Sequence, residues 1–357
     1  MGRGGVAVLL PSYRVVIEPG ATSRIVALVD ESAPAHRVAV ITDSTVGPLY
    51  ARRVATAFAD RAAIFTIANG EAAKTRDTWS RLTDEMLAAG FGRDTTVVAI
   101  GGGVVGDIAG FVAATYMRGV PIVQIPTTLL AMIDASIGGK TGVDTPLGKN
   151  LVGAFHQPSL VVIDPQTLAT LPANHFRAGL AEALKHGVVA SEEYFAVIAG
   201  ARESTARDDA TLMAIVTGSV RIKAAIVTRD ERESGIRKVL NFGHTIGHAI
   251  ESVSNYRLLH GEAVAIGMAL EADLASRIGV ANAGTATAIR DALAAIGLPT
   301  NLPPFDRSAI LHATKSDKKS RAGRVEYALP TRIGAMAGED RGWGTSANDS
   351  DVLAVLG

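Results

Sequence analysis

The sequence contains no cysteine among its 357 residues. Disulfide bonds, thiolate catalysis and cysteine-ligated zinc sites are therefore excluded. It also lacks an excess of charge, because 35 lysines and arginines balance 35 aspartates and glutamates. A protein that binds nucleic acid through its phosphates normally carries a basic excess, so we do not expect a polynucleotide partner.

Long hydrophobic runs are missing as well. The apolar runs Ile122–Ile125 and Val161–Ile163 are much shorter than the roughly 20 residues that span a bilayer. The apolar stretch within residues 1–17 is too short for a signal peptide and has no small-residue cleavage site, so it predicts a first strand. We therefore expect a cytoplasmic protein without membrane contact.

In the first half of the chain, short β-branched runs alternate with helical patterns. The predicted strands are Val38–Thr42, Ala63–Ile67, Thr96–Ile100, Val120–Ile125 and Leu160–Ile163, and the predicted helices are Val46–Phe58 and Arg76–Ala89. Apolar strands separated by helices are typical of a parallel sheet. Residues 1–172 are therefore predicted to form an α/β domain with a parallel sheet.

The pattern changes near Pro172, and helices dominate beyond it. The predicted helices are Leu180–Val189, Glu192–Ala199, Ala210–Thr228, Asn241–Ser254, Gly261–Ile278 and Thr285–Ala295. A short strand at Val325–Leu329 and a Gly-, Ser- and Asp-rich loop over residues 339–350 precede a last short helix. Residues 173–357 are therefore predicted to form a mostly α-helical second domain.

A glycine cluster from Gly101 to Gly106 links the strand Thr96–Ile100 to a helical pattern over Ile108–Thr115. Backbone N–H groups at such a turn can approach a phosphate closely, and the helix dipole favours its charge. A simple tight turn is the alternative. Asp43 ends an earlier strand, where a carboxylate can accept a hydrogen bond from a ribose hydroxyl. Since it precedes the glycines, whereas the usual dinucleotide motif has it after them, the order favours a variant nucleotide-binding fold.

Three of the eight histidines, His244, His248 and His260, fall within 17 residues. The first two are four residues apart, so they share a helix face and can bind one metal ion. His260 lies just before a predicted helix, and Glu182 offers a carboxylate on another helix. Three protein ligands with one open position suit a catalytic metal, but the spacing does not say which of these histidines are ligands.

Several cations have unusual neighbours for surface residues. Lys140 and Lys149 are predicted to lie in glycine-rich loops, and Lys185 follows Glu182 by one helical turn. The other cations of this set are Arg118, Lys223, Arg237, Lys318 and Lys319. In a chain without net charge the set favours a small anionic substrate, because each charge-assisted hydrogen bond contributes roughly 1.5–3 kcal/mol.

Long motifs in this sequence resemble those of the 3-dehydroquinate synthase family and stand in the same order. They are GGGVVGDIAGFVAATYMRG, QIPTTLLAMIDASIGGKTGVDTPLGKNLVGAFHQP, GLAEALKHG and LNFGHTIGHAIE followed by LHGEAVAIGM. The resemblance runs from about Asp43 to Lys319. It implies a Rossmann-like NAD-binding domain, a helical metal- and substrate-binding domain, bound NAD and a divalent metal, zinc or cobalt.

The resemblance also implies roles for individual residues. It makes Glu182, His244 and His260 the metal ligands and assigns His248 to the phosphate of the substrate. The other implied contacts to phosphate or ring hydroxyls are Lys140, Asn150, Asn241, Asp134 and Lys185, with Arg118 reaching across from the second subunit of a homodimer. The implied contacts to the substrate carboxylate are Lys223 and Arg237, with Lys318 and Lys319 nearby.

The NAD contacts that the resemblance implies all lie in the first domain. They are Asp43, Glu71, Lys74, Gly102, Gly103, Val104, Asp107, Thr127, Thr128, Lys140, Lys149 and Thr170. The sequence departs from the family at Asp144, where asparagine is frequent, and at His186, where tyrosine is frequent.

The implied activity is that of a carbon–oxygen lyase in the shikimate pathway, which leads to chorismate and the aromatic amino acids. It converts 3-deoxy-D-arabino-heptulosonate 7-phosphate to 3-dehydroquinate and phosphate by transient oxidation with NAD, loss of phosphate, re-reduction and aldol ring closure. Two alternatives stay open. The first is another sugar phosphate cyclase, but such enzymes act on uncharged substrates and have no use for Arg237 and Asn241 beside His248. The second is a metal-dependent polyol dehydrogenase, which would release NADH.

Overall fold

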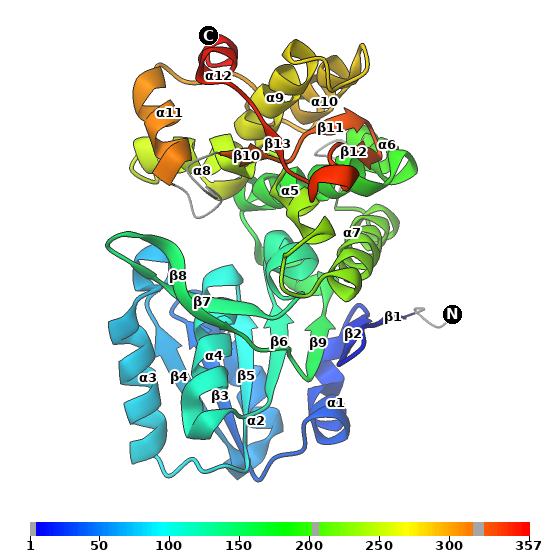
Figure 1. Ribbon diagram of the computed structural model, residues 1–357. Helices are drawn as coiled ribbons and strands as arrows, with labels where there is room; N and C mark the ends of the chain where they lie inside the picture. Colours follow the sequence, from blue (N-terminus) through cyan, green and yellow to red (C-terminus); the bar gives the residue numbers. More distant parts are fainter. Residues whose placement is uncertain (1–4, 202–206, 317–324) are drawn as a thin grey trace. The chain divides into compact units, whose positions relative to one another are not determined.

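The computed structural model describes residues 5–201, 207–316 and 325–357. The chain divides into two compact units, Met1–Leu171 (unit 1) and Pro172–Gly357 (unit 2). This division lies one residue from the boundary expected from the sequence. Each unit is described by itself (Figure 1).

Unit 1 contains a seven-stranded sheet in the order β1-β2-β9-β6-β5-β3-β4. The strands are β1 (Val6–Leu9), β2 (Arg14–Ile17), β3 (Arg37–Asp43), β4 (Ala62–Ile67), β5 (Thr95–Gly101), β6 (Ile122–Pro126) and β9 (Leu160–Ile163). Every neighbouring pair is parallel except β1 and β2. The five strands predicted in this half are all present, so the predicted parallel α/β fold is confirmed.

Helices cover both faces of this sheet, which explains why its central strands are apolar on both sides. The helices α1 (Ile25–Ser32) and α2 (Arg52–Ala57) pack on one face, and α3 (Arg76–Ala88) and α4 (Gly103–Thr115) pack on the other (Figure 1). Every residue of β5 is buried. Of the predicted helix Val46–Phe58, only α2 is α-helical, because the residues before it, Gly47–Ala51, form a π-helical turn.

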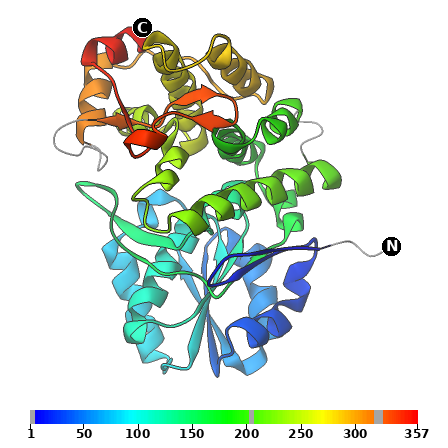
Figure 2. The ribbon, with the colours of Figure 1, turned by 45° about the vertical axis from the view of Figure 1, so that its right-hand side comes forward.

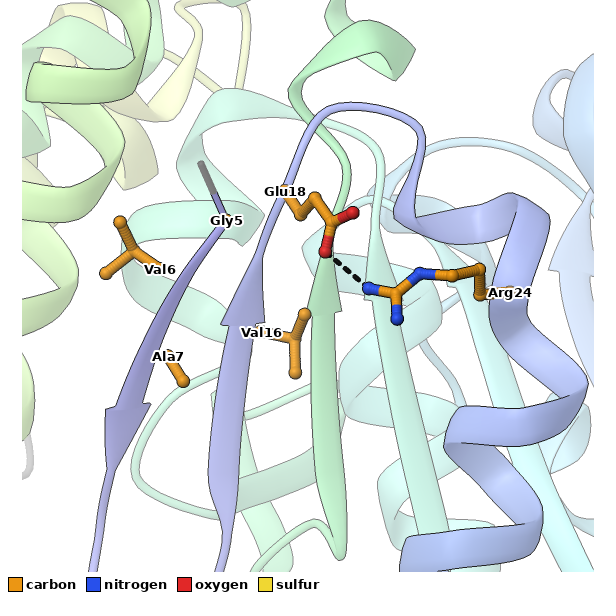
Figure 3. A pocket seen from close by; sticks show the side chains of 6 residues that line it. All are labelled: Gly5, Val6, Ala7, Val16, Glu18 and Arg24. Atoms are coloured by element: carbon orange, nitrogen blue, oxygen red, sulfur yellow. Dashed lines mark hydrogen bonds and ion pairs between the residues drawn. The ribbon is translucent and has the colours of Figure 1, made fainter. Parts of the chain in front are cut away.

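The N-terminal segment forms a hairpin and not the single strand that the sequence predicted. Pro11 and Ser12 lie in the turn that separates β1 from β2, and proline is a frequent turn residue. The hairpin forms one edge of the sheet (Figure 2). A hollow beside it is lined by Gly5, Val6, Ala7, Val16, Glu18 and Arg24, and an ion pair joins Arg24 to Glu18 (Figure 3). No predicted site residue lines this hollow, so it is not the candidate site.

A second hairpin corrects the prediction that Lys140 and Lys149 lie in loops. Both belong to strands, β7 (Lys140–Thr145) and β8 (Gly148–Phe155), which pair antiparallel. Gly142 opposes Gly153 across the pair, and a Cβ on Gly153 would lie 2.0 Å from the carbonyl oxygen of Thr141. Strands are predicted from β-branched and aromatic residues. The glycines that allow these two strands to approach closely take the place of such residues, so the strands were missed.

Unit 2 is mostly helical, as predicted. Its helices are α5 (Ala173–Ala190), α6 (Glu192–Gly200), α7 (Asp209–Arg229), α8 (His244–Val253), α9 (His260–Arg277), α10 (Thr285–Ala295), α11 (Arg307–Ser316) and α12 (Asp349–Val355). The sequence did not predict α11. The predicted strand Val325–Leu329 is reduced to β10 (Glu326–Tyr327), and the predicted loop 339–350 contributes its partner, β13 (Thr345–Ser346). A second short pair is β11 (Pro330–Arg332) with β12 (Ala335–Met336).

Helix α7 is long and apolar enough to cross a membrane, by length and composition alone. Half of its most apolar stretch is buried inside the structure. Its buried face includes Leu212, Ile215, Val220 and Lys223. One helix of this kind is weak evidence for a membrane span, since the core helix of a soluble protein passes the same test.

Candidate metal centre and nucleotide-binding edge

Close packing of α8 against α9 brings the histidines of unit 2 together. Gly243 immediately precedes α8, and a Cβ built on Gly267 of α9 would lie 2.0 Å from the carbonyl oxygen of Gly243. Only glycine allows so close an approach. The ring centroids of His244 and His260 lie 5.4 Å apart, and the centroid of His248 lies 5.2 Å from that of His244.

A carboxylate from α5 meets two of these imidazoles. Oε1 of Glu182 lies 3.3 Å from Nε2 of His244 and 3.4 Å from Nε2 of His260. One ligand atom from each of the three residues lies within 4.8 Å of the other two. Glu182 and His244 are buried and His260 is partly exposed. Two imidazole nitrogens and one carboxylate oxygen are a donor set that catalytic zinc commonly takes, with a further position left for substrate.

The surroundings of Glu182 test whether these residues fit a metal ion. Both carboxylate oxygens are buried, and they have different neighbours. Nζ of Lys185 forms an ion pair with Oε2, whereas Oε1 faces the two imidazole nitrogens. A buried carboxylate needs compensation on every side. A divalent cation held by Oε1, His244 and His260 would provide it on the open side, so the residues present fit a metal.

The charges in this cluster set the protonation of the ligands. Burial alone would raise the pKa of Glu182, but Lys185 and His244 hold it well below its usual range. Burial and the charge of Lys185 lower the pKa of His244 to about 3. Burial acts in the same direction on His260, but contacts with Glu182 and Glu251 raise its pKa to about 10. His244 is therefore a neutral ligand already, while a metal ion must displace a proton from His260.

Glu251 of α8 is a functional residue that the sequence reasoning missed. It is buried, and its Oε2 lies 3.3 Å from Nδ1 of His260 and 3.9 Å from Nε2 of His248. These three residues form a second cluster with metal-binding spacing. A carboxylate at Nδ1 keeps the proton there and leaves Nε2 of His260 free for a metal. The spacing of 244, 248 and 251 places all three side chains on one helix face, and this signal was present in the sequence.

The substrate-binding cations predicted in unit 2 are largely buried. Lys223 on α7 is 6% exposed and Arg237, in the 3₁₀ turn Ile236–Asn241, is 2% exposed. The amide nitrogen of Arg237 donates to Asp230, and Nδ2 of Asn241 donates to Oε1 of Glu233 at 2.6 Å. The ring of His248 is 40% exposed. Lys318 and Lys319 lie outside the described residues.

The predicted phosphate loop of unit 1 has the expected strand–glycine–helix form. Gly102 is the N-cap of α4 and offers no side chain to the first helical turn. A Cβ on Gly101 would lie 2.5 Å from the side chain of Val105, and one on Gly106 would lie 2.9 Å from Gln124. Glycine at position 101 therefore allows α4 to pack close to β5, whereas at position 106 the contact is with the flexible end of Gln124. The amide groups of Gly103 and Val104 lie in the first turn of α4, where a helix attracts an anion.

Asp43 lies at the C-terminal end of β3, next to β5 in the sheet. Between β3 and β5 the order of connections reverses, because β4 lies on one side of β3 and β5 on the other. Ligands of open α/β sheets bind outside the carboxyl ends of the strands at such a switch point. Oδ1 of Asp43 accepts hydrogen bonds from the amides of Thr45 and Val46, both at 2.8 Å. This interaction fixes the carboxylate at the predicted ribose position.

The charged residues predicted to line the cofactor site in unit 1 pair with one another. Nζ of the buried Lys74 lies 2.5 Å from Oδ2 of Asp107, and Nζ of Lys149 lies 3.4 Å from Oε1 of Glu71. Burial alone would lower the pKa of Lys74, but Asp107, Glu71 and Asp144 raise it. Burial raises the pKa of Asp144 despite the hydrogen bond from the amide of Asn150. Asp107 is thus a partner of Lys74 before any ligand binds.

The other predicted residues of unit 1 lie in turns or on the β7–β8 hairpin. The amide of Thr127 donates to Gly101, and Oγ1 of Thr128 accepts from Ala131 at the start of the π-helical turn that contains Asp134. Oγ1 of Thr170 lies 2.7 Å from the hydroxyl of Tyr50. The remaining three, Lys140, Asn150 and Arg118, are exposed.

Comparison with known proteins extends these observations. The family model described as 3-dehydroquinate synthase N-terminal matches residues 64–178, and the model described as 3-dehydroquinate synthase C-terminal matches residues 179–320. A 3-dehydroquinate synthase of Symbiobacterium thermophilum is 45% identical over 91% of this chain and 92% of its own. One of Geobacter metallireducens is 48% identical over 84% of this chain and 85% of its own.

Solved structures agree with these sequence matches. A 2-deoxy-scyllo-inosose synthase complexed with carbaglucose-6-phosphate, NAD⁺ and Co²⁺ has a TM-score of 0.90 at 25% identity, with 99% of each chain covered. A 2-epi-5-epi-valiolone synthase of Streptomyces hygroscopicus with NAD⁺ and Zn²⁺ bound has a TM-score of 0.85 at 32% identity, with 98% of this chain and 97% of the other covered. A probable glycerol dehydrogenase of Sinorhizobium meliloti, 18% identical with a TM-score of 0.64 over 95% and 93% of the two chains, shares the fold alone.

The greatest identities among these proteins are to the two 3-dehydroquinate synthases, and the matches of both family models together span most of the chain. The buried glutamate–histidine cluster lies within the match of the C-terminal model, and the glycine turn lies within the match of the N-terminal model. The chain belongs to the 3-dehydroquinate synthase family.

Proposed function

We propose that this chain converts 3-deoxy-D-arabino-heptulosonate 7-phosphate to 3-dehydroquinate and phosphate, as a carbon–oxygen lyase of the cytoplasm. The observation that carries the proposal is the cluster of Glu182, His244 and His260, whose ligand atoms lie within 4.8 Å of one another. It is found in a chain 45–48% identical to curated 3-dehydroquinate synthases. The reaction is redox-neutral overall, so the enzyme should need only catalytic amounts of NAD.

Glu182, His244 and His260 would hold the metal ion, zinc or cobalt. When bound, it supplies Lewis-acid stabilisation of negative charge on a substrate oxygen. Lys185 holds Glu182 ionised, and Glu251 orients the ring of His260. These two residues keep the ligand set in place before the metal arrives, so little reorganisation is needed on binding.

The cations of unit 2 match a substrate with a carboxylate and a phosphate. Lys223 and Arg237 are buried, and a buried guanidinium or ammonium binds a carboxylate strongly because little water competes. The partly exposed ring of His248 lies beside the metal ligands, where it can donate a hydrogen bond to the phosphate. Together these groups would orient the substrate and compensate its charge, which is how a protein accelerates an elimination.

The edge of unit 1 at the ends of β3 and β5 would bind NAD. Gly102, Gly103 and Val104 would offer backbone amides to the pyrophosphate at the start of α4, and Asp43 would accept from the adenosine ribose. Gly101 leaves no room for a side chain beside Val105, which lets α4 begin close to the end of β5. When bound, NAD takes up and returns the two electrons of the transient oxidation.

We further propose a homodimer in which Arg118 serves the site of the other subunit. Met117, Arg118 and Gly119 have φ of 51°, 69° and 118°. The guanidinium of Arg118 has no hydrogen bond or ion pair with any residue in the described ranges, and it is exposed. Backbone strain of this kind is concentrated at functional sites, which supports a binding role for Arg118. Mixing Arg118→Gly with His260→Ala subunits should restore activity, because a hybrid dimer then has one complete site.

The direct test is to incubate the purified protein with NAD⁺, Zn²⁺ and the heptulosonate phosphate. We expect release of inorganic phosphate and formation of dehydroquinate without a lasting rise in absorbance at the nicotinamide band near 340 nm. A steady rise of that absorbance with simple polyols would identify a dehydrogenase and contradict the proposal. Phosphate release from an uncharged sugar phosphate, but not from the sugar acid, would identify a different cyclase.

A further inference from the structure

We infer that Glu271 is a positioning residue for the metal centre, because its carboxylate caps α8 from the neighbouring helix and so sets where His244 presents its ring. The inference rests on the proposed function, in which His244 is a metal ligand. Neither the sequence patterns nor the resemblance pointed to Glu271, which lies three turns into α9.

Glu271 is fully buried, and both of its oxygens are used at one place. Oε2 accepts a hydrogen bond from the amide of Gly243 at 2.7 Å, and Oε1 accepts from the amide of Ile246 at 2.9 Å. These are the N-cap and N3 amides of α8. His244 is the first residue of the helix and lies between them. A single carboxylate therefore bridges the backbone on both sides of the ligand.

Helix α8 needs this external cap because of its own N-cap residue. The first amides of a helix have no partner within it, and an N-cap side chain usually supplies one. Here the N-cap is Gly243, with φ of 77° and no side chain. A Cβ at this position would lie 2.3 Å from Cγ of Met268 and 2.9 Å from its amide nitrogen, so the packing of α8 on α9 excludes a capping side chain. The cap must come from another element.

The bridging carboxylate acts on the metal centre through geometry. Two hydrogen bonds to amides three residues apart fix both the position and the rotation of the first turn. Nδ1 of His244 lies 3.1 Å from the carbonyl oxygen of Phe242, so the ring is held by the same short segment. Any shift of residues 242–246 along α9 therefore moves Nε2 of His244 relative to Glu182 and His260. The negative charge of Glu271 also suits the positive end of the α8 dipole.

The test is metal binding by the variant Glu271→Gln. The amide keeps one acceptor and turns an NH₂ group toward the other backbone amide, so one of the two hydrogen bonds is lost. We expect zinc affinity to fall roughly 10- to 100-fold, the effect typical of residues that orient ligands. We also expect the visible absorption bands of the Co²⁺-loaded protein to shift, because they report the ligand geometry directly. Glu271→Asp keeps the charge but is one methylene shorter. Its zinc affinity should therefore lie between that of Glu271→Gln and that of the wild type.

The matched control is Leu274→Ala on the same helix. Leu274 is fully buried in the core of unit 2, and its truncation destabilises the unit while leaving the carboxylate of Glu271 and its two backbone partners chemically unchanged. Unfolding of unit 2 can be followed through Trp343 in a Trp79→Phe background, because the chain has two tryptophans. We expect Leu274→Ala to lower stability while zinc affinity and the Co²⁺ spectrum stay unchanged.

The outcomes separate this inference from the proposed function. If wild type binds zinc and Glu271→Gln binds it equally well with the same Co²⁺ spectrum, Glu271 has no positioning role. If affinity falls in Leu274→Ala in proportion to its lost stability, as in Glu271→Gln, the effect is one of stability and the inference is wrong. If wild type itself binds no zinc, the metal centre and this inference fail together. Should Glu271→Gln not fold, Glu271→Asp is measured by the same criteria.

Discussion

The two units hold their charged side chains in different ways. In unit 2 the ion pair of Lys185 with Glu182 is almost completely buried, with side chains 2% and 1% exposed. In unit 1 the side chains of Lys74 and Asp107 are 5% and 21% exposed, and those of Lys149 and Glu71 are 28% and 41% exposed. The charged groups of unit 2 therefore form a buried cluster. In unit 1 the ion pairs are more exposed, and the predicted NAD contacts at the start of α4 are backbone amides. Single substitutions should affect unit 2 through ligand geometry and unit 1 through local stability.

The largest effect is expected from His260→Ala. It removes one of three metal ligands and the nearer imidazole partner of Glu251, so phosphate release should fall by roughly 10³-fold or more. Metal content after dialysis should fall with it. His175→Ala is the matched control, because His175 lies on α5 in the same unit but is exposed. Full metal content together with undiminished phosphate release in His260→Ala would show that His260 is not a ligand.

The second prediction concerns the pH dependence of metal binding by unit 2. The pKa of His260 is raised to about 10 and that of His244 is lowered to about 3. Between these values only His260 carries a proton that the metal must displace, so binding releases one proton and becomes stronger as the pH rises. Zinc affinity should increase about tenfold per pH unit between about pH 6 and 9, as measured by competition with a chelator of known pH dependence. A pH dependence that indicates release of two protons, or of none, would contradict the prediction that only His260 loses a proton when zinc binds.

The third prediction tests unit 1. Lys74→Met removes the buried cation and leaves Asp107 and Asp144 without their main counter-charge, so we expect unfolding free energy to fall by about 2–3 kcal/mol, less than for a fully buried pair. Urea unfolding followed through Trp79 of α3, in a Trp343→Phe background, reports on this unit. The control Arg81→Met breaks an exposed pair with Glu85 and should cost at most about 1 kcal/mol. If both variants lost the same unfolding free energy, the burial of Lys74 would make no difference to the stability of unit 1.

Elements that depend on local sequence could be predicted, whereas elements that depend on contacts between distant segments could not. Apolar strands such as Thr95–Gly101 and the helix Thr285–Ala295 have periodicities that depend on neighbouring residues alone, so they were predicted almost to the residue. The hairpin with Gly142 and Gly153 was missed, because its glycines serve a close contact between strands.

Predicting the site from sequence was limited in a similar way. Spacing indicated a metal among three histidines but could not choose the ligands, since the choice depends on where α5 places Glu182 against α8 and α9. Glu271 gave no sequence signal, because its role exists only when two helices touch at glycine. Long-range packing of this kind is invisible to local patterns.

The smallest expected effect is a gain of stability in unit 1. Arg118 has φ of 69°, a left-handed conformation that costs a side-chain-bearing residue about 1–2 kcal/mol. Arg118→Gly relieves this strain at an entropic cost of roughly 0.5–1 kcal/mol, so unit 1 should become more stable by about 0.5–1 kcal/mol. Phosphate release should fall at the same time, because the substitution removes a proposed phosphate ligand. Arg52→Gly is the control, since Arg52 is exposed on α2 and follows a helical N-cap, and it should lower stability. If Arg118→Gly destabilises the unit or leaves phosphate release intact, the strain at this turn serves the fold and not the substrate.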